Sequence, residues 1–141
     1  MYLYHATSIK NKQSIDKHGL LIGCKSNWQD IYTSEAIYLA VDPDVAEDYV
    51  TASDTYNGEE VIVYQVDIND IDQSKVYYDW NNRCEYSSEI NSVEYRDNIP
   101  PKFLSPAKER DQEIEDFKGT LLYERVMRVF DEEVETNLEK E

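Results

Sequence analysis

Short strand-like and helix-like segments alternate through the opening third of the chain, and each ends at a recognisable stop signal. Apolar and aromatic residues predict a strand over 1–5. A helix is expected over 11–18, because Gly19 follows at the C-cap, where glycine adopts a left-handed conformation at least cost. A second strand is expected over 36–41, and a second helix over 43–51 begins with proline, which suits a first helical turn. Together these segments predict an α+β fold.

The middle of the chain adds further strands. Val61–Asp67 is the clearest strand in the sequence, and shorter strands are expected over 75–78 and 92–96. Polar stretches without periodicity predict long loops over 21–35 and 79–91. We therefore expect two small, mostly antiparallel sheets that form a cleft, with helices at their flanks.

From Pro106 onward the sequence becomes charged and helical. Apolar residues recur there at helical spacing, which predicts a stripe along one helix face: Leu122, Val126, Val129, Phe130 and Val134. A helix docked on its own domain is the first interpretation of this stripe, and a partner-binding helix is the alternative. We expect residues 1–105 to form the core domain and residues 106–141 a helical extension packed on it.

The charge of the chain limits the classes of partner. It carries 30 acidic against 14 basic residues, a formal net charge of -16. Such a field repels nucleic acid and anionic membranes at long range and attracts basic protein surfaces. Direct binding of nucleic acid is therefore not expected. A chain this acidic can also imitate nucleic acid on a basic partner, and acidic residues also promote solubility.

The sequence offers little for a membrane, a disulfide framework or a metal. No apolar run approaches the roughly 20 residues that a bilayer requires, and no secretory leader precedes the first strand, so we expect a cytoplasmic protein. Cys24 and Cys84 do not form a metal or disulfide motif. His5 and His18 are the only histidines, and no metal site is predicted.

An ordered set of short motifs carries a family resemblance. His5-Ala6-Thr7 lies at the first strand, Gly19-Leu20 closes the first helix, Tyr38 lies in the second strand and Tyr49 in the helix after it. In this order they resemble the ADP-ribosyltransferase superfamily of the His-Tyr-Glu type, which includes the poly(ADP-ribose) polymerases and diphtheria-toxin-like enzymes. The resemblance covers residues 2–50 well and residues 61–104 loosely. It implies a split β-sandwich with a cleft for NAD.

The resemblance also implies a role for each motif residue. His5 and Thr7 would hold ribose hydroxyls, and the backbone of Ala6 would pair with the nicotinamide carboxamide. The family usually has glycine at this last position, and alanine keeps both backbone groups while restricting their dihedral angles. Tyr38 and Tyr49 would stack on the nicotinamide ring, with Tyr38 also counted among the catalytic residues.

A carboxylate is required near the ribose and the nucleophile. Glu94 is our choice, because the superfamily often places its glutamate on a strand shortly before an Ile-Pro-Pro step such as 99–101. Its carboxylate would bind a ribose hydroxyl, offset positive charge in an oxocarbenium-like transition state and orient the attacking group. Glu89 and Glu85 are the alternatives. Trp28 and Trp80, in the two predicted loops, either flank the cleft or are buried.

The function that the resemblance implies is mono-ADP-ribosyl transfer from NAD, as co-substrate, to a macromolecular acceptor, with a basic protein favoured by the charge. NAD hydrolysis would use the same residues. Transfer of an RNA 2'-phosphate needs arginines near the His5 motif, and none adjoins it. The alternative from another class is a non-enzymatic acidic interaction or inhibitor protein. Small size and family analogy favour an intracellular effector such as a toxin or a phage-encoded modifier.

Overall fold

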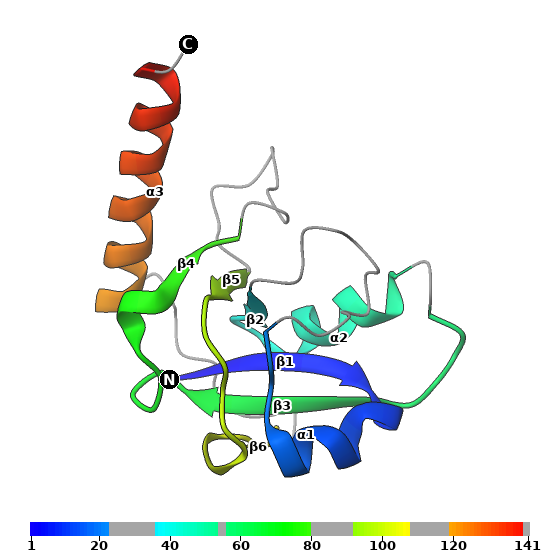
Figure 1. Cartoon of the computed structure of the whole chain (residues 1–141). Coiled ribbons are helices and arrows are strands. Elements are labelled where there is room, and N and C mark those ends of the chain that lie inside the picture. Colours follow the sequence, from blue (N-terminus) through cyan, green and yellow to red (C-terminus); the bar gives the residue numbers. More distant parts are fainter. Residues whose placement is uncertain (23–35, 54–55, 80–91, 108–118, 140–141) are drawn as a thin grey trace.

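A computed structural model describes residues 1–22, 36–53, 56–79, 92–107 and 119–139. Its described strands form a six-stranded, entirely antiparallel sheet with the order β4-β5-β2-β1-β3-β6, accompanied by three α-helices (Figure 1). The mixed α and β architecture predicted from the sequence is thus confirmed at this level. The elements are β1 (Tyr2–Ser8), α1 (Lys12–His18), β2 (Ile37–Ala40), α2 (Pro43–Thr51), β3 (Val61–Asp67), β4 (Val76–Tyr78), β5 (Ser92–Tyr95), β6 (Ser105–Pro106) and α3 (Leu121–Glu139).

Strand β1 is longer than the sequence predicted. It pairs with β3 over seven residues, from Tyr2 opposite Asp67 to Ser8 opposite Val61. This long antiparallel ladder carries the strand past the predicted end at residue 5. His5 consequently lies in the middle of β1 and not at its end.

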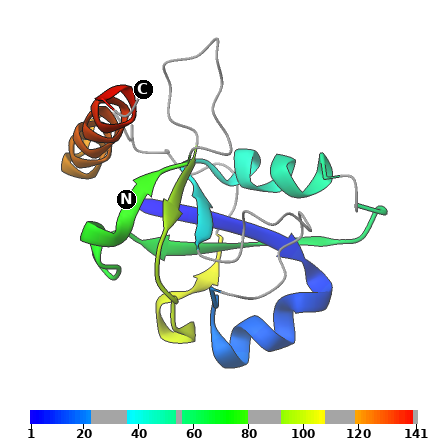
Figure 2. The ribbon, with the colours of Figure 1, turned by 45° about the horizontal axis from the view of Figure 1, so that its top comes forward.

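The described strands are joined in one sheet, whereas the sequence predicted two. The junction between the halves is narrow, because the register between β1 and β2 is recorded at one pair, Tyr4 opposite Ala40. Figures 1 and 2 show β1 and β3 lying side by side in opposite directions, while β2 and β5 cross them steeply. The sheet therefore turns sharply between β1 and β2 but stays one sheet, because the backbone pairing of Tyr4 with Ala40 joins the two strands.

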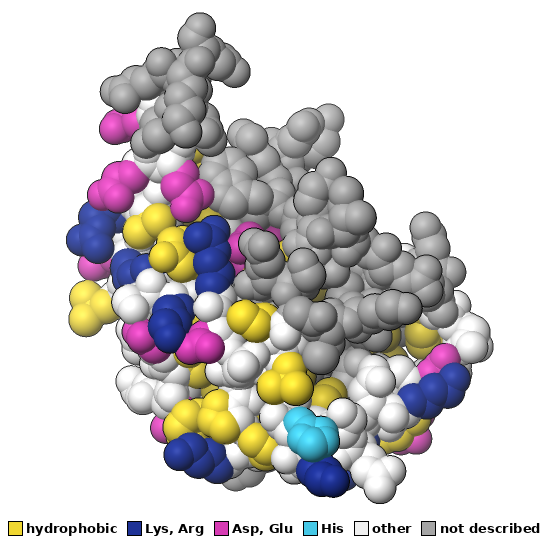
Figure 3. All heavy atoms as spheres, in the orientation of Figure 1, with side chains coloured by type: hydrophobic (Ala, Val, Ile, Leu, Met, Phe, Trp, Pro, Cys, Tyr) yellow, Lys and Arg dark blue, Asp and Glu magenta, His cyan; other side chains and the backbone are white. Residues whose placement is uncertain are grey.

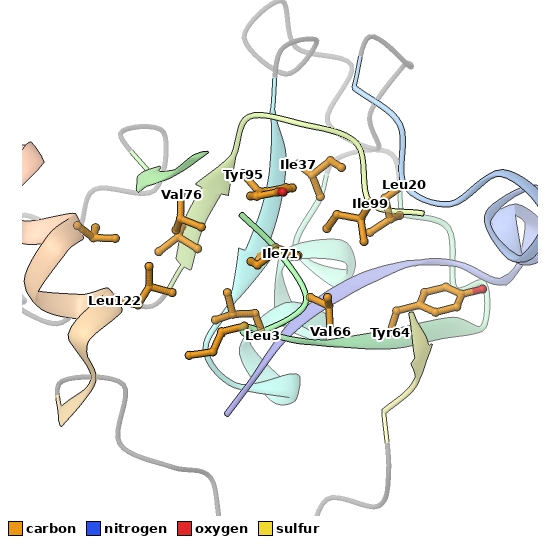
Figure 4. Packing of buried hydrophobic residues seen from close by; sticks show 14 of the residues in the cluster. Leu3, Leu20, Ile37, Tyr64, Val66, Ile71, Val76, Tyr95, Ile99 and Leu122 are labelled. Carbon is orange, nitrogen blue, oxygen red and sulfur yellow. The ribbon is translucent and has the colours of Figure 1, made fainter. Parts of the chain in front are cut away.

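The larger core lies on the sheet face that receives α1 and α3 (Figure 4). Four strands, β1, β2, β4 and β5, each contribute a completely buried side chain to it: Leu3, Leu39, Val76 and Val93. Helix α2 covers the opposite face, where Tyr4, Ala6 and Ala40 pack against its Ala46 and Val50 in a second, smaller cluster. The alternation of strand side chains thus divides the sheet residues between two apolar layers.

The exit of α1 is tied to the chain that follows β5. Gly19 caps α1 with φ 80°, as the sequence predicted, and its N–H donates to the Ile15 carbonyl at 2.8 Å. Leu20 and Ile99 then exchange two backbone hydrogen bonds of 2.9 Å each. Helix α2 also begins as predicted, since Asp42 caps it and Pro43 occupies its first turn.

Helix α3 runs along the β4 edge and extends beyond the sheet (Figures 1 and 2). Leu122 and Val126 of the predicted apolar stripe are buried in the large core, while Phe130 contacts the Tyr78 ring at a centroid distance of 4.4 Å. The Arg125 guanidinium donates to two backbone carbonyls, those of Val76 and Ser74. These bonds cover an otherwise open sheet edge. Pro106, where the helical extension was expected to begin, belongs to β6, and residues 108–118 between β6 and α3 lie outside the described residues.

Candidate functional site

Three side chains, two of them predicted site residues, lie in one row across β2, β5 and the edge strand β4. Glu94 of β5 is directly opposite Tyr38 of β2 on one side and Tyr77 of β4 on the other. Opposed residues of antiparallel strands project to the same face, with Cβ atoms about 4.5–5.5 Å apart. The structure therefore brings Tyr38 and Glu94 together, although the two are far apart in the sequence. Tyr77 is a member of the row that sequence reasoning missed.

Glu94 is a largely buried carboxylate with one cationic contact. Its side chain is 13% exposed, and the Arg96 Nε atom lies 3.3 Å from Oε2. Burial raises the pKa of the Glu94 carboxyl above its ordinary value, and the adjacent Arg96 charge opposes that rise. The negative charges of Asp79 and Glu133 add to the rise in pKa. Burial and the two acidic neighbours thus favour the protonated form of Glu94, and Arg96 favours the carboxylate.

A buried Asp–Ser pair forms the next row of the same face. Asp79 and Ser92 are 5% and 3% exposed, and the Ser92 hydroxyl donates to the Asp79 carboxylate at 2.6 Å. Ser92 lies two residues before Glu94 on β5, so both side chains project to one face. Asp79 lies directly after β4, in the stretch expected as a loop, and its pairing with Ser92 was not predicted. An acidic residue directly after a β-branched and aromatic strand was the available signal.

His5 is attached to the site through the backbone of Tyr38. Its Nδ1 lies 2.9 Å from the Tyr38 carbonyl oxygen. A carbonyl can only accept, so Nδ1 carries the proton and Nε2 of the neutral ring carries a lone pair. Burial lowers the pKa of His5 below its usual 6.5, and the hydrogen bond to the carbonyl opposes this shift only in part. The Nε2 atom makes no hydrogen bond to the described part of the chain.

The two ends of the His5–Tyr38 contact come from opposite sheet faces. Along β1, His5 alternates with Tyr4 and Ala6, which pack on the α2 side. Tyr38 shares that α2 side, because its strand neighbours Ile37 and Leu39 belong to the large core. The His5 ring therefore reaches the Tyr38 carbonyl at the narrow junction of β1 and β2, where it adds a side-chain hydrogen bond to the backbone pairing of Tyr4 with Ala40.

The remaining residues of the family pattern are placed as follows. Ala6 is on the α2 side of β1, as are Tyr38 and Glu94. Tyr49 is partly buried on α2 and packs against the same small cluster. Thr7 is 3% exposed, and its hydroxyl accepts a hydrogen bond from Asn11 at 2.8 Å. Stacking of Tyr38 and Tyr49 on a ring, and the binding of ribose by Thr7, stay predictions.

Several candidates fall outside the described residues. They are the alternative carboxylates Glu85 and Glu89, the tryptophans Trp28 and Trp80, and the cysteines Cys24 and Cys84. Among the residues that the structure describes, no three histidine, cysteine or acidic side chains are grouped so as to hold a metal ion. None of the described helices combines the length and apolarity needed to cross a membrane.

The surface shows how the charge is distributed over one face. In Figure 3, acidic and basic side chains are interspersed where the described residues are coloured, and the basic side chains do not gather into one patch.

Comparison with protein-family models and with curated proteins found no match to this chain.

Proposed function

We propose that this protein is an NAD-dependent mono-ADP-ribosyltransferase on an ADP-ribosyltransferase-like fold, with a macromolecular acceptor that is a basic protein. The observation that carries the proposal is the direct opposition of Tyr38 and Glu94 across β2 and β5, with His5 hydrogen-bonded to the Tyr38 carbonyl. Residues of the three types that define the family pattern thus lie on the adjoining strands β1, β2 and β5, with the His5 side chain on the opposite sheet face from those of Tyr38 and Glu94. NAD would supply the ADP-ribose and the nicotinamide leaving group.

The chemistry of these side chains fits a nucleotide sugar. The lone pair on Nε2 of neutral His5 can accept a hydrogen bond from a ribose hydroxyl, and the fixed Nδ1 contact holds the ring in one tautomer. Tyr38 places an aromatic ring on the same sheet face as the Glu94 carboxylate, at the directly opposed position. A sheltered carboxylate stabilises positive charge on a sugar more strongly than one in water does.

The proposed reaction breaks the bond between the ribose anomeric carbon and the nicotinamide nitrogen. The bonding electron pair leaves with nicotinamide, which becomes neutral. A lone pair of the acceptor side chain forms the new bond to the anomeric carbon, and Glu94 takes the proton that the acceptor loses. Orientation and electrostatics are the contributions of the protein, and no redox partner is needed.

The test is transfer of label from NAD that is labelled in its adenylate phosphate. Purified protein, labelled NAD and a cell lysate are incubated beside the Glu94→Gln variant and a matched control, Glu124→Gln, at an exposed position of α3. We expect label on a macromolecule with the wild type and with Glu124→Gln, and a loss of about 100-fold or more with Glu94→Gln. Equal labelling by all three proteins would contradict the role of Glu94.

Two other functions give different results in the same experiment. Free ADP-ribose without a labelled macromolecule indicates an NAD glycohydrolase, in which water replaces the acceptor. No NAD turnover, together with salt-sensitive binding to a basic partner that survives Glu94→Gln, indicates the acidic interaction protein. The net charge of -16 is the observation that favours this second class.

A further inference from the structure

Arg96 is held on two sides beside the candidate catalytic carboxylate. Its guanidinium carbon lies 3.6 Å from the centroid of the Tyr77 ring, and its Nε lies 3.3 Å from Glu94 Oε2. The backbone N–H of Arg96 donates to the Lys75 carbonyl at 3.0 Å, which continues the pairing of β5 with the chain before β4. Stacking on an aromatic face suits the planar guanidinium and fixes its orientation.

The geometry around Tyr77 distinguishes Arg96 from the second arginine nearby. Arg125 of α3 also lies over the Tyr77 ring, at 5.4 Å from its centroid. Its terminal nitrogens, however, are bonded to the Val76 and Ser74 carbonyls. Among the described residues, Arg96 is the one cation in contact with the Glu94 carboxylate.

The other groups that act on Glu94 come from three elements. Asp79, directly after β4, and Glu133 of α3 are negative and lie close enough to influence its carboxyl. Tyr77 and Tyr38 flank it on the neighbouring strands. With burial and two like charges acting against ionisation, Arg96 is the one described group that favours the carboxylate form.

We propose that Arg96, stacked on Tyr77, is a positioning residue that keeps the Glu94 carboxylate ionised and fixed in orientation at the candidate site. The inference rests on the proposed function for its catalytic meaning, since a protonated Glu94 can neither accept a proton nor balance charge on the ribose. The contact itself, and its effect on Glu94, exist in the free protein. They can therefore be tested without NAD.

The first experiment is a pH titration of the Glu94 carboxyl by NMR, with carbon-13 in the glutamate side chains and assignment by the Glu94→Gln spectrum. In Arg96→Gln we expect the Glu94 pKa to rise by about one unit relative to the wild type. Arg96→Lys keeps the charge and gives a smaller rise. Arg128→Gln, which removes the same charge from an exposed position of α3, leaves the Glu94 pKa unchanged.

A Tyr77→Leu variant tests the stacking separately, because it keeps Arg96 and removes only the ring. It gives a second test of the proposal if the arginine variants misfold. Loss of the ring frees the guanidinium, so the Glu94 pKa rises by less than in Arg96→Gln, while native-like spectra report an intact sheet. The proposal is overturned if Arg96→Gln leaves the Glu94 pKa at its wild-type value. It is also overturned if Arg128→Gln shifts that pKa equally, because the effect would then be one of net charge.

The pH dependence of NAD turnover separates this inference from the proposed function. If the wild type turns over NAD, the acidic limb of its pH–rate profile moves to higher pH in Arg96→Gln and is restored toward wild type in Arg96→Lys. An unmoved limb contradicts the positioning role. If the wild type has no turnover, the transferase proposal fails, and the NMR titration still decides whether Arg96 controls Glu94.

Discussion

Replacing Gly19 with alanine is expected to destabilise the fold far more than a glycine substitution in open space. Gly19 has φ 80° and ψ -166°, a region of backbone conformation that residues other than glycine almost never adopt. A Cβ atom added there would lie 2.1 Å from the Ile99 carbonyl oxygen. That oxygen accepts a hydrogen bond from Leu20, so neither side can move without breaking the link between α1 and the chain after β5.

The size of the effect follows from these two contributions. Backbone strain at such a φ and ψ costs about 1–3 kcal/mol. Relief of the clash separates Leu20 from Ile99 and sacrifices their two hydrogen bonds, each worth about 0.5–1.5 kcal/mol net. The expected loss for Gly19→Ala is therefore about 2–6 kcal/mol in the free energy of unfolding. This is a large part of the roughly 5–15 kcal/mol that stabilises a typical domain.

Gly58 is the matched control. Its φ is 87°, but an added Cβ atom would meet nothing within 4 Å, so Gly58→Ala carries backbone strain without the clash. Urea denaturation followed by circular dichroism measures both variants against the wild type. We expect Gly19→Ala to lose more stability than Gly58→Ala by about 1–3 kcal/mol, from the broken hydrogen bonds. Equal losses in the two variants would refute the steric part of the reasoning.

Two further predictions concern the candidate site. Because burial lowers the pKa of His5, the unfolded chain takes up a proton near pH 6.5 that the folded protein does not, so stability falls below that pH by up to about 1.4 kcal/mol per pH unit. Urea denaturation between about pH 7.5 and 5 should show this slope flattened in His5→Gln and retained in His18→Gln. Ser92→Ala removes a hydrogen-bond donor from the buried Asp79 carboxylate and should lower the free energy of unfolding by about 1–3 kcal/mol, measured by the same urea denaturation. The control Ser74→Ala should lower it by no more than about 1 kcal/mol, because Ser74 is exposed.

Local signals in the sequence predicted much of the fold. The run Val61–Asp67 forms β3 with the predicted bounds, because its β-branched and aromatic residues suit a half-buried strand. Helix α2 begins at Pro43 and ends at Thr51, as the proline indicated. Each of these features depends on residues close together in the chain, which is why sequence reasoning was sufficient.

The parts that sequence reasoning missed depend on contacts between distant residues. Strand β1 continues to Ser8 because β3 pairs with its whole length, and β6 forms only where β3 offers a partner. The contact of Arg96 with Tyr77 depends on the register of β4 against β5. The His5–Tyr38 hydrogen bond ends on a backbone carbonyl, which every residue has, so the sequence cannot indicate this partner.

Salt separates the two function classes because they predict opposite responses. NAD is a net anion through its pyrophosphate, so the field of a chain with a net charge of -16 opposes its approach. Screening by added salt weakens that repulsion, and the apparent affinity for NAD should therefore rise between about 0.01 and 0.15 M ionic strength. An acidic protein that binds a basic partner loses attraction over the same range, and its affinity for that partner falls.

Calorimetric titration of NAD and of a basic partner at both ionic strengths measures how each affinity changes with salt. Affinity for NAD that falls steeply with salt would mean that local cations hold its phosphates, and the long-range argument would be wrong.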